Sequence, residues 1–289
     1  MRIPFLGSAA LAAGQLSRSQ LRTGYRPIYR GIYVPREHEV TLRDRIQGAA
    51  LATGGVIAGV AASAVHGANW VDVDAPIEVI GATRPRHGLV LHDERVTAHE
   101  ITRVGGVRVT TVTRTAFDLG RRLPREQAVA RLDALCHVRR VDMADVLALA
   151  TLNPRARGLP ALRKALPLVD GGAESPRETW LRLLLVDAGL PIPTTQFVIH
   201  ENGRYIRRVD MVWEQFKVGA EYDGAQHLTS RAQYAKDVWA ARELARLDWH
   251  ILHVIKEDAA ADIVREARAA LIARGWRPGR PARRTHTHP

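Results

Sequence analysis

Hydrophobic and polar positions in the C-terminal third of the chain follow the two-residue period of strands. The pattern holds over residues 195–200, 205–213 and 216–222. An Asn-Gly dipeptide at 202–203 separates the first two stretches, and this dipeptide is typical of a tight hairpin turn. A further short apolar stretch, residues 250–255, predicts a fourth strand.

Helical patterns precede, interrupt and follow these predicted strands. A serine followed three residues later by glutamate or glutamine forms a capping box, and it opens the helices predicted over residues 175–189 and 230–247. Residues 259–273 predict a last helix. The order α-β-β-β-α-β-α predicts an α/β domain of the α+β type, with a mixed central sheet, over residues 174–274.

The N-terminal segment predicts a helix, a turn, a second helix and a hairpin. Residues 8–13 have a helical pattern, a capping box at 17–20 opens the second helix, and residues 25–35 alternate as a hairpin does. This order of elements describes a winged helix, which places its second helix in the major groove of DNA. We therefore assign residues 1–40 to a winged-helix DNA-binding domain.

Helices and strands alternate in the middle segment, residues 41–170. Its five histidines have no spacing that suits a metal site, and it contains no catalytic motif, so we interpret it as an α/β scaffold or sensor domain. The predicted elements are helices over 46–51, 61–66, 113–119 (capped by Thr113) and 125–138, and strands over 77–80 and 88–91.

The charge balance indicates a polyanionic partner. The net charge is +12 at pH 7, and such an excess of basic residues most often indicates that a protein binds nucleic acid. The first 36 residues contain six arginines and no acidic residue, so we expect this end to bind double-stranded DNA. A solvated basic terminus is the alternative. The candidate phosphate-binding residues are Arg18, Arg22, Arg26 and Arg30.

The ends of the chain bear on its localisation. No stretch reaches the ~18 apolar residues of a membrane span, and the opening apolar stretch is interrupted by Pro4 and Gly7, unlike a secretory signal. We expect a cytoplasmic protein, associated with the nucleoid when it binds DNA, with no membrane partner. Residues 275–289 are rich in arginine and proline and predict a basic disordered tail.

Carboxylates interrupt the predicted C-terminal sheet. Asp210 stands within an apolar strand, and Glu221 and Asp223 end the next one. Alternate residues of a strand share a face, so we expect Glu221 and Asp223 on one side of the sheet. The neighbouring antiparallel strand can bring Asp210 beside Glu221, and carboxylates so close repel unless a cation lies between them. Oxygen ligands favour Mg²⁺ or Mn²⁺, and such an ion can generate hydroxide to attack a phosphodiester. Gly224 lets the chain turn so that His227 approaches the site, where it could accept the water's proton or stabilise the leaving group.

The same residues have structural interpretations. Arg207 and Arg208 offer an ion-pair partner to the carboxylates of the sheet, because buried carboxylates are rare without one. Glu178 is fully explained as the glutamate of the capping box that begins at Ser175. Asp237 and Arg242 suit an ordinary solvated helix face.

Residues 174–258 resemble the PD-(D/E)XK nuclease superfamily, and more narrowly its branch similar to very-short-patch-repair endonucleases. The resemblance rests on ESPRETWLRLLLVDAGLP, RRVDMVW, KVGAEYDGAQH and YAKDVWAARELARLDWHILHV. It implies a restriction-endonuclease-like fold in which Asp210 and Glu221 hold the metal ion and Glu178 completes or orients its shell. Asp223 and His227 would then handle the attacking water.

The resemblance also implies that Asp237 and Arg242 brace this site from the following helix. The superfamily's usual lysine, two residues past the acidic ligand, is Asp223 here, and Lys217 or Lys236 would have to replace it in space. The branch usually has an arginine where this chain has His253.

The N-terminal stretches LSRSQLRTG and IYRGIYVP resemble the winged helix of AbiEi-type antitoxins. GVIAGVAASAVHG and VTTVTRTAFDLGRR resemble the remainder of such proteins. Two hypotheses follow. One is a DNA-binding protein with a Mg²⁺- or Mn²⁺-dependent endonuclease domain. The other is a non-catalytic transcriptional regulator or antitoxin, with a toxin partner or a homodimer, in which the nuclease fold serves binding or dimerisation.

Overall fold

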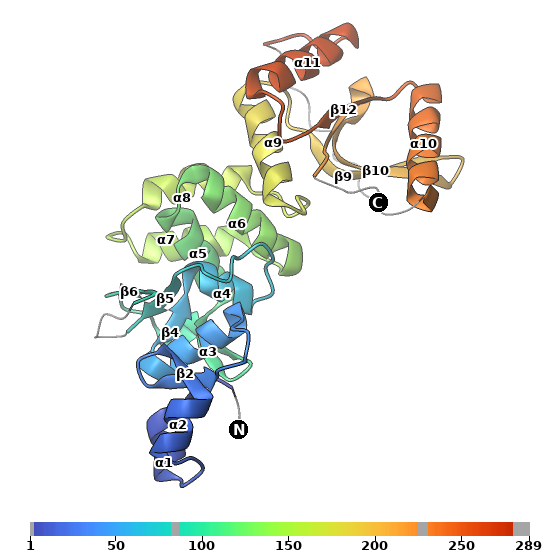
Figure 1. Ribbon diagram of the computed structural model, residues 1–289. Helices are drawn as coiled ribbons and strands as arrows, with labels where there is room; N and C mark the ends of the chain where they lie inside the picture. Colours follow the sequence, from blue (N-terminus) through green and yellow to red (C-terminus); the bar gives the residue numbers. More distant parts are fainter. Residues whose placement is uncertain (1–2, 82–86, 225–230, 280–289) are drawn as a thin grey trace. The chain divides into compact units, whose positions relative to one another are not determined.

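A computed structural model describes residues 3–81, 87–224 and 231–279, and the statements below concern these residues (Figure 1). The chain divides into two compact units, residues 1–171 and 172–289. Both combine helices with sheets, which confirms the predicted α+β class. No helix in the described ranges is long and apolar enough to cross a membrane.

The chain begins with a small module of two helices and three strands, in which β3 pairs with both β1 and β2 in an antiparallel sheet. The Ser17–Gln20 capping box is present, with both reciprocal hydrogen bonds, and Gly31 takes a φ of +85° in the hairpin. The helix–turn–helix–hairpin order is therefore confirmed. Its elements are β1 (Phe5–Leu6), α1 (Gly7–Ala12), α2 (Arg18–Gly24), β2 (Tyr25–Tyr29) and β3 (Ile32–Pro35).

A five-stranded mixed sheet follows, in the order β6-β5-β4-β8-β7. Its apolar residues, such as Ile57, Val79 and Val109, are buried together with residues of α3 and α4. The elements are α3 (Leu42–Thr53), β4 (Val56–Ala58), α4 (Gly59–Val65), β5 (Ile77–Ile80), β6 (Leu89–His92), η1 (Ala98–Glu100), β7 (Ile101–Val104) and β8 (Val107–Thr110).

A layer of helices completes the first unit and encloses its own core around Phe117 and Leu132. The prediction that Thr113 caps the helix over 113–119 is wrong. Thr111 is the N-cap, and its hydroxyl accepts the Arg114 amide at 3.3 Å. Threonine, a good N-cap residue, occurs at 110, 111 and 113. The residue type alone therefore does not show which of these positions is the N-cap. The elements are α5 (Val112–Arg122), α6 (Arg125–Val138), α7 (Met143–Leu152), α8 (Leu159–Ala165) and η2 (Leu166–Leu168).

The second unit contains a four-stranded sheet in the order β12-β11-β10-β9, with β11 and β12 parallel and the other pairs antiparallel. Helices α9 and α11 lie on one face of this sheet and α10 on the other (Figure 1). Leucines of α9 and α11 belong to one core cluster, and Leu244 of α10 belongs to another. The predicted α-β-β-β-α-β-α order is confirmed. The elements are α9 (Pro176–Asp187), β9 (Thr194–Glu201), β10 (Arg204–Trp213), η3 (Glu214–Phe216), β11 (Val218–Tyr222), α10 (Arg231–Arg246), β12 (His250–Val254) and α11 (Ala260–Ala273).

The third strand of this unit starts later than the predicted residue 216. Residues Glu214–Phe216 form a 3₁₀ turn, and Lys217 has a φ of +49°, so the extended conformation begins only at Val218. Of the predicted basic tail, residues 280–289 lie outside the described residues.

Candidate functional site

Neighbouring strands of the second unit bring three potential metal ligands together. Glu221 on β11 lies opposite His253 on the parallel strand β12, and Asp223 follows two residues after Glu221. The Nδ1 atom of His253 lies 2.9 Å from Oδ2 of Asp223 and 3.7 Å from Oε2 of Glu221. One ligand atom from each residue lies within 4.8 Å of the others. The expectation that Glu221 and Asp223 share a face of the sheet is thus confirmed.

Glu221 already has a cationic partner. Its two carboxylate oxygens accept hydrogen bonds of 2.7 Å from Nε and Nη2 of Arg207, and the residue is only 4% exposed. Arg207 also contacts Asp237 on α10, at 3.3 Å. The hydrogen bonds to Glu221 raise the pKa of Arg207 further above its usual range. This ion pair is the structural alternative to a metal site that was considered for the carboxylates of the sheet. A metal ion that binds Glu221 would have to compete with Arg207.

Asp210 lies outside the three-residue group but interacts electrostatically with two of its members, Glu221 and Asp223. Its Oδ2 accepts the backbone amide of Tyr222 at 2.9 Å, and among the described residues it is not part of the group that converges within 4.8 Å. Burial raises the pKa of Asp210 to about 6, and the negative charges of Glu178 and Glu221 raise it as well, against the lowering by the Tyr222 amide. The structure therefore groups Glu221 with Asp223 and His253, and Glu178, Glu221 and Asp223 all interact electrostatically with Asp210.

Glu178 forms hydrogen bonds that stabilise the start of α9. One carboxylate oxygen lies 2.8 Å from the Ser175 hydroxyl, and the other accepts from the Glu174 amide and from Nε2 of Gln196, both at 2.9 Å. These contacts join the helix to β9. Both oxygens of Glu178 are therefore engaged in holding the fold.

The remaining predicted site residues lie in different surroundings. Arg242 is exposed on α10, and no hydrogen bond or ion pair of its side chain joins it to another described residue. Lys217, considered as a replacement lysine, donates to the Leu247 carbonyl at 3.0 Å, and Lys236 is exposed. His227 lies outside the described residues.

Replacing Asp210 with asparagine is expected to stabilise the second unit at neutral pH. The pKa of Asp210 is about 6 in the folded chain, above the ~4 of an unfolded carboxyl, so the folded state loses stability as the pH rises from about 4 to 6. Asparagine keeps an acceptor for the Tyr222 amide and carries no charge. We expect a gain of about 1–2 kcal/mol at pH 7.5 and little change at pH 4.

Urea unfolding followed by tryptophan fluorescence measures this effect, because five of the six tryptophans lie in the second unit. Asp262→Asn is the control. Asp262 is exposed on α11, and the change should stay within about 0.5 kcal/mol. Equal pH dependence of wild type and Asp210→Asn would contradict the assignment of a raised pKa to Asp210.

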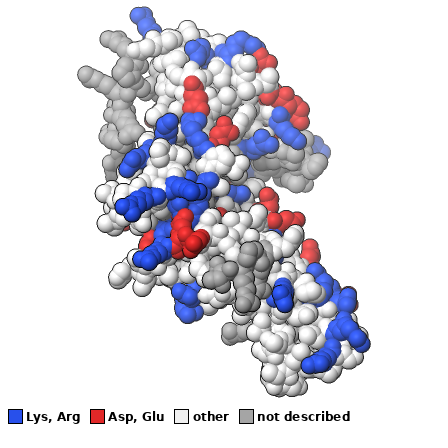
Figure 2. Space-filling model, turned by 90° about the vertical axis from the view of Figure 1, so that its left-hand side faces the viewer, with Lys and Arg blue, Asp and Glu red and all other residues white. Residues whose placement is uncertain are grey.

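Three of the four arginines predicted to bind DNA are exposed on the N-terminal module, and the fourth forms hydrogen bonds within the protein. Arg18 and Arg22 are exposed on α2, and Arg30 is exposed at the hairpin. Arg26 instead donates to the carbonyl of His38 at 2.9 Å and to that of Arg36 at 3.4 Å. In Figure 2 the lowest part of the molecule, where Figure 1 places α1 and α2, shows basic side chains without acidic ones.

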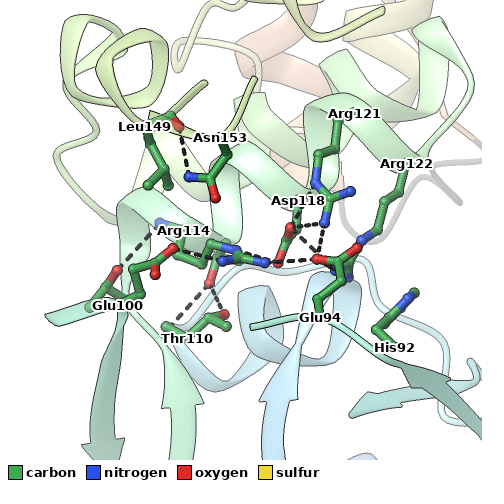
Figure 3. Close-up of polar contacts among 12 residues, drawn as sticks. His92, Glu94, Glu100, Thr110, Arg114, Asp118, Arg121, Arg122, Leu149 and Asn153 are labelled. Carbon is green, nitrogen blue, oxygen red and sulfur yellow. Dashed lines mark hydrogen bonds and ion pairs between the residues drawn. The ribbon is translucent and has the colours of Figure 1, made fainter. Parts of the chain in front are cut away.

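A buried network of arginines and carboxylates in the first unit was not predicted (Figure 3). Arg114, 2% exposed, contacts Glu94 at 2.9 Å, Glu100 at 2.6 Å and Asp118 at 3.1 Å. Arg121 pairs with Asp118 and Glu94. The signal in the sequence was the i, i+4, i+7 spacing of Arg114, Asp118 and Arg121, which puts all three on one face of α5.

Arg122 extends this network to another strand. It lies 3.0 Å from both Glu78 and Glu94. Burial alone would raise the pKa of Glu94, but the hydrogen bonds and charges of Arg121 and Arg122 outweigh it and hold the pKa at about 2. Glu94 is therefore ionised at neutral pH and fixes both guanidinium groups.

Parts of this chain are similar in sequence to known proteins. Residues 49–168, which include the network, match the family model described as the AbiEi antitoxin C-terminal domain. Two Mycobacterium tuberculosis proteins, the uncharacterized proteins MT2308 (strain CDC 1551 / Oshkosh) and Rv2248 (strain H37Rv), are each 34% identical to this chain over 175 residues. The match covers 61% of this chain and 64% of each relative.

These findings support the AbiEi-type part of the resemblance, whereas the nuclease resemblance of residues 174–258 stays a prediction. Over residues 49–168, this chain is similar to the AbiEi antitoxin C-terminal domain.

Proposed function

We propose that this chain is a non-catalytic, DNA-binding regulator of the antitoxin type. The observation that carries the proposal is the match of residues 49–168 to the AbiEi antitoxin C-terminal domain, on the C-terminal side of a helix–turn–helix–hairpin module that ends at Pro35. In this proposal the module binds double-stranded DNA and the matched domain faces a toxin partner. Such a protein works in the cytoplasm, at the nucleoid when it is bound to DNA.

The geometry of the module supports DNA binding. Its second helix, α2, exposes Arg18 and Arg22, and arginines so placed bind phosphates next to a groove. The capping box at Ser17 and the Arg26 hydrogen bonds fix α2 and the hairpin without using those two side chains. The exposed arginines are therefore available on a rigid support.

The second unit, in this proposal, serves binding or dimerisation. Arg207 already neutralises the buried carboxylate of Glu221, and Glu178 is engaged at the start of α9. These contacts support a structural role, because both carboxylates already have hydrogen-bond partners within the protein.

A metal-dependent endonuclease is the second candidate function. The convergence of Glu221, Asp223 and His253 within 4.8 Å favours it, and a pocket of about 630 Å³ lined by Asp223, Asp237 and His253 lies beside them. These oxygen and imidazole ligands would suit Mg²⁺ or Mn²⁺. In this alternative Arg207 has to release Glu221 before the residue can coordinate an ion.

One experiment separates the two candidates. The full chain is incubated with supercoiled plasmid and Mg²⁺ or Mn²⁺, and the DNA is examined before and after the protein is removed. We expect retarded plasmid that returns to the supercoiled form on deproteinisation. Relaxed or linear DNA from the wild type, absent with Glu221→Gln and Asp223→Asn, would favour the endonuclease and contradict the non-catalytic proposal.

A further inference from the structure

A pocket of about 670 Å³ opens in the first unit beside the arginine–carboxylate network. This volume lies within the range of about 300–1,000 Å³ that is typical of small-molecule sites. With histidine neutral, the lining has a net charge of +2, because four arginines face two glutamates. The charged residues of the lining are Arg121, Arg122, Arg131, Arg157, Glu78 and Glu94.

The two glutamates of the pocket are already fully engaged. Glu78 accepts the Val60 amide at 3.0 Å, His92 lies 2.7 Å from it, and Arg122 lies 3.0 Å from it. Glu94 accepts from Arg121 and Arg122, and Figure 3 shows these contacts meeting at its carboxylate. This wall is thus fixed in place before any ligand arrives, which lowers the entropic cost of binding.

Two arginines at the pocket form no ion pair with a carboxylate among the described residues. Arg131 donates to the Trp70 carbonyl, and within the described ranges no carboxylate forms an ion pair with it, although Asp72 acts on it electrostatically. Arg157 is exposed, and its guanidinium contacts no other described residue by a hydrogen bond or ion pair. Each guanidinium carries five N–H donors suited to carboxylate or phosphate.

Gly158 holds the loop that carries Arg157 against the end of α5. Its φ is +85°, and a Cβ atom placed there would lie 1.9 Å from the Arg121 carbonyl oxygen. Only glycine tolerates both conditions. Nη1 of Arg121 also donates to the Arg157 carbonyl at 3.4 Å, so the network itself positions the backbone of Arg157.

We propose that this pocket binds a small molecule that bears a carboxylate or phosphate group. Arg131 and Arg157 hold the anion, and the apolar part of the molecule packs on Val60, Pro76 and Leu123. A ligand site in the domain similar to antitoxins would let a small-molecule effector act on the protein. This regulation goes beyond the proposed binding of DNA and of a toxin partner.

Calorimetric titration of the full chain at constant ionic strength tests the proposal, with inorganic phosphate, phenyl phosphate and benzoate as probes. We expect phenyl phosphate to bind more tightly than inorganic phosphate, because the apolar wall contributes. Benzoate and phenyl phosphate differ in the anionic group. The probe that binds with the higher affinity therefore shows whether the pocket prefers a carboxylate or a phosphate.

The double variant Arg131→Gln, Arg157→Gln should weaken the tighter probe about tenfold or more, because charge-assisted hydrogen bonds are lost. Arg163→Gln is the matched control, since Arg163 is exposed on α8 and outside the pocket lining. Equal affinity of the wild type and the double variant would overturn the proposal, as would no heat of binding with any of the three probes. Both glutamine variants should keep wild-type DNA affinity, so this result is separate from the DNA-binding proposal.

Discussion

Arg114→Met is expected to lower the free energy of unfolding of the first unit by about 3–5 kcal/mol, the usual cost of removing one partner of a buried ion pair. Arg114 is 2% exposed and contacts three carboxylates. Methionine fills much of the space but leaves Asp118, which is 0% exposed, with fewer cationic partners. Arg121 and Arg122 remain near Asp118, which keeps the loss within this range.

The pH dependence of this loss has a defined sign. In the variant the remaining carboxylates have lost a cation, so their folded pKa values rise and they take up protons more readily. The deficit relative to the wild type should therefore be largest near pH 7 and should shrink as the pH falls toward 4. A deficit that grows on acidification would contradict the assignment of Arg114 as their counter-ion.

Hydrogen exchange of peptides from α5 and α6, measured by mass spectrometry in increasing denaturant, reports on the first unit alone. Arg103→Met is the matched control. Arg103 is an exposed arginine on β7, and the one hydrogen bond of its side chain to another described residue is to the Gly106 carbonyl, at 3.5 Å. It should change stability by less than about 0.5 kcal/mol. A loss below about 1 kcal/mol for Arg114→Met would show that the network does not hold this unit together.

The double variant Arg18→Ala, Arg22→Ala is expected to bind duplex DNA about tenfold or more weakly than the wild type at physiological salt, because two phosphate contacts are lost. Both side chains are exposed on α2. The capping box that holds this helix uses neither of them. The variant should therefore fold normally, which circular dichroism checks.

Arg163→Ala controls for the loss of positive charge outside the module. Arg26→Ala should behave differently, because Arg26 fastens the hairpin to the segment that follows it. We expect this variant to lower the stability of the module as well as its DNA affinity. Unchanged binding by the Arg18, Arg22 variant would move the DNA contact to another surface.

Local signals in the sequence predicted most of the elements. The helix predicted over 125–138 and the strand predicted over 77–80 coincide with α6 and β5. The helix was recognisable because its amphipathic pattern extends over many residues, and the strand because its residues are strongly apolar. The capping box at Ser17 and the Asn-Gly turn at 202–203 also formed, with positive φ at both turn residues. The two-residue strand β1 has no period to detect and was missed. The short strands β4, β7 and β8 and the helices α7 and α8 of the first unit were also missed.

The candidate site was predicted less completely, because its contacts join distant segments. Adjacent arginines at 207 and 208 were equivalent in the sequence, but only Arg207 reaches Glu221, whereas Arg208 pairs with Glu174. The approach of His253 depends on the parallel pairing of β11 with β12, which no local pattern specifies.

The arginine network shows the same limit. Arg114, Asp118 and Arg121 have a helical spacing, but their partners Glu94 and Glu100 come from preceding segments of the chain. An arginine on the face of a helix looks solvent-exposed in the sequence until the packing around it is known. The burial of Arg114 is therefore a property of the tertiary structure rather than of α5 alone.

The salt dependence of duplex binding tests the central claim most directly. For the full chain, the logarithm of the binding constant is measured against the logarithm of the salt concentration by fluorescence anisotropy. Each phosphate contact adds about 0.9 to the slope, so the account predicts a steep slope for the wild type and a slope lower by about 1.8 for Arg18→Ala, Arg22→Ala. The same slope for both proteins would contradict the claim that the N-terminal module binds the DNA.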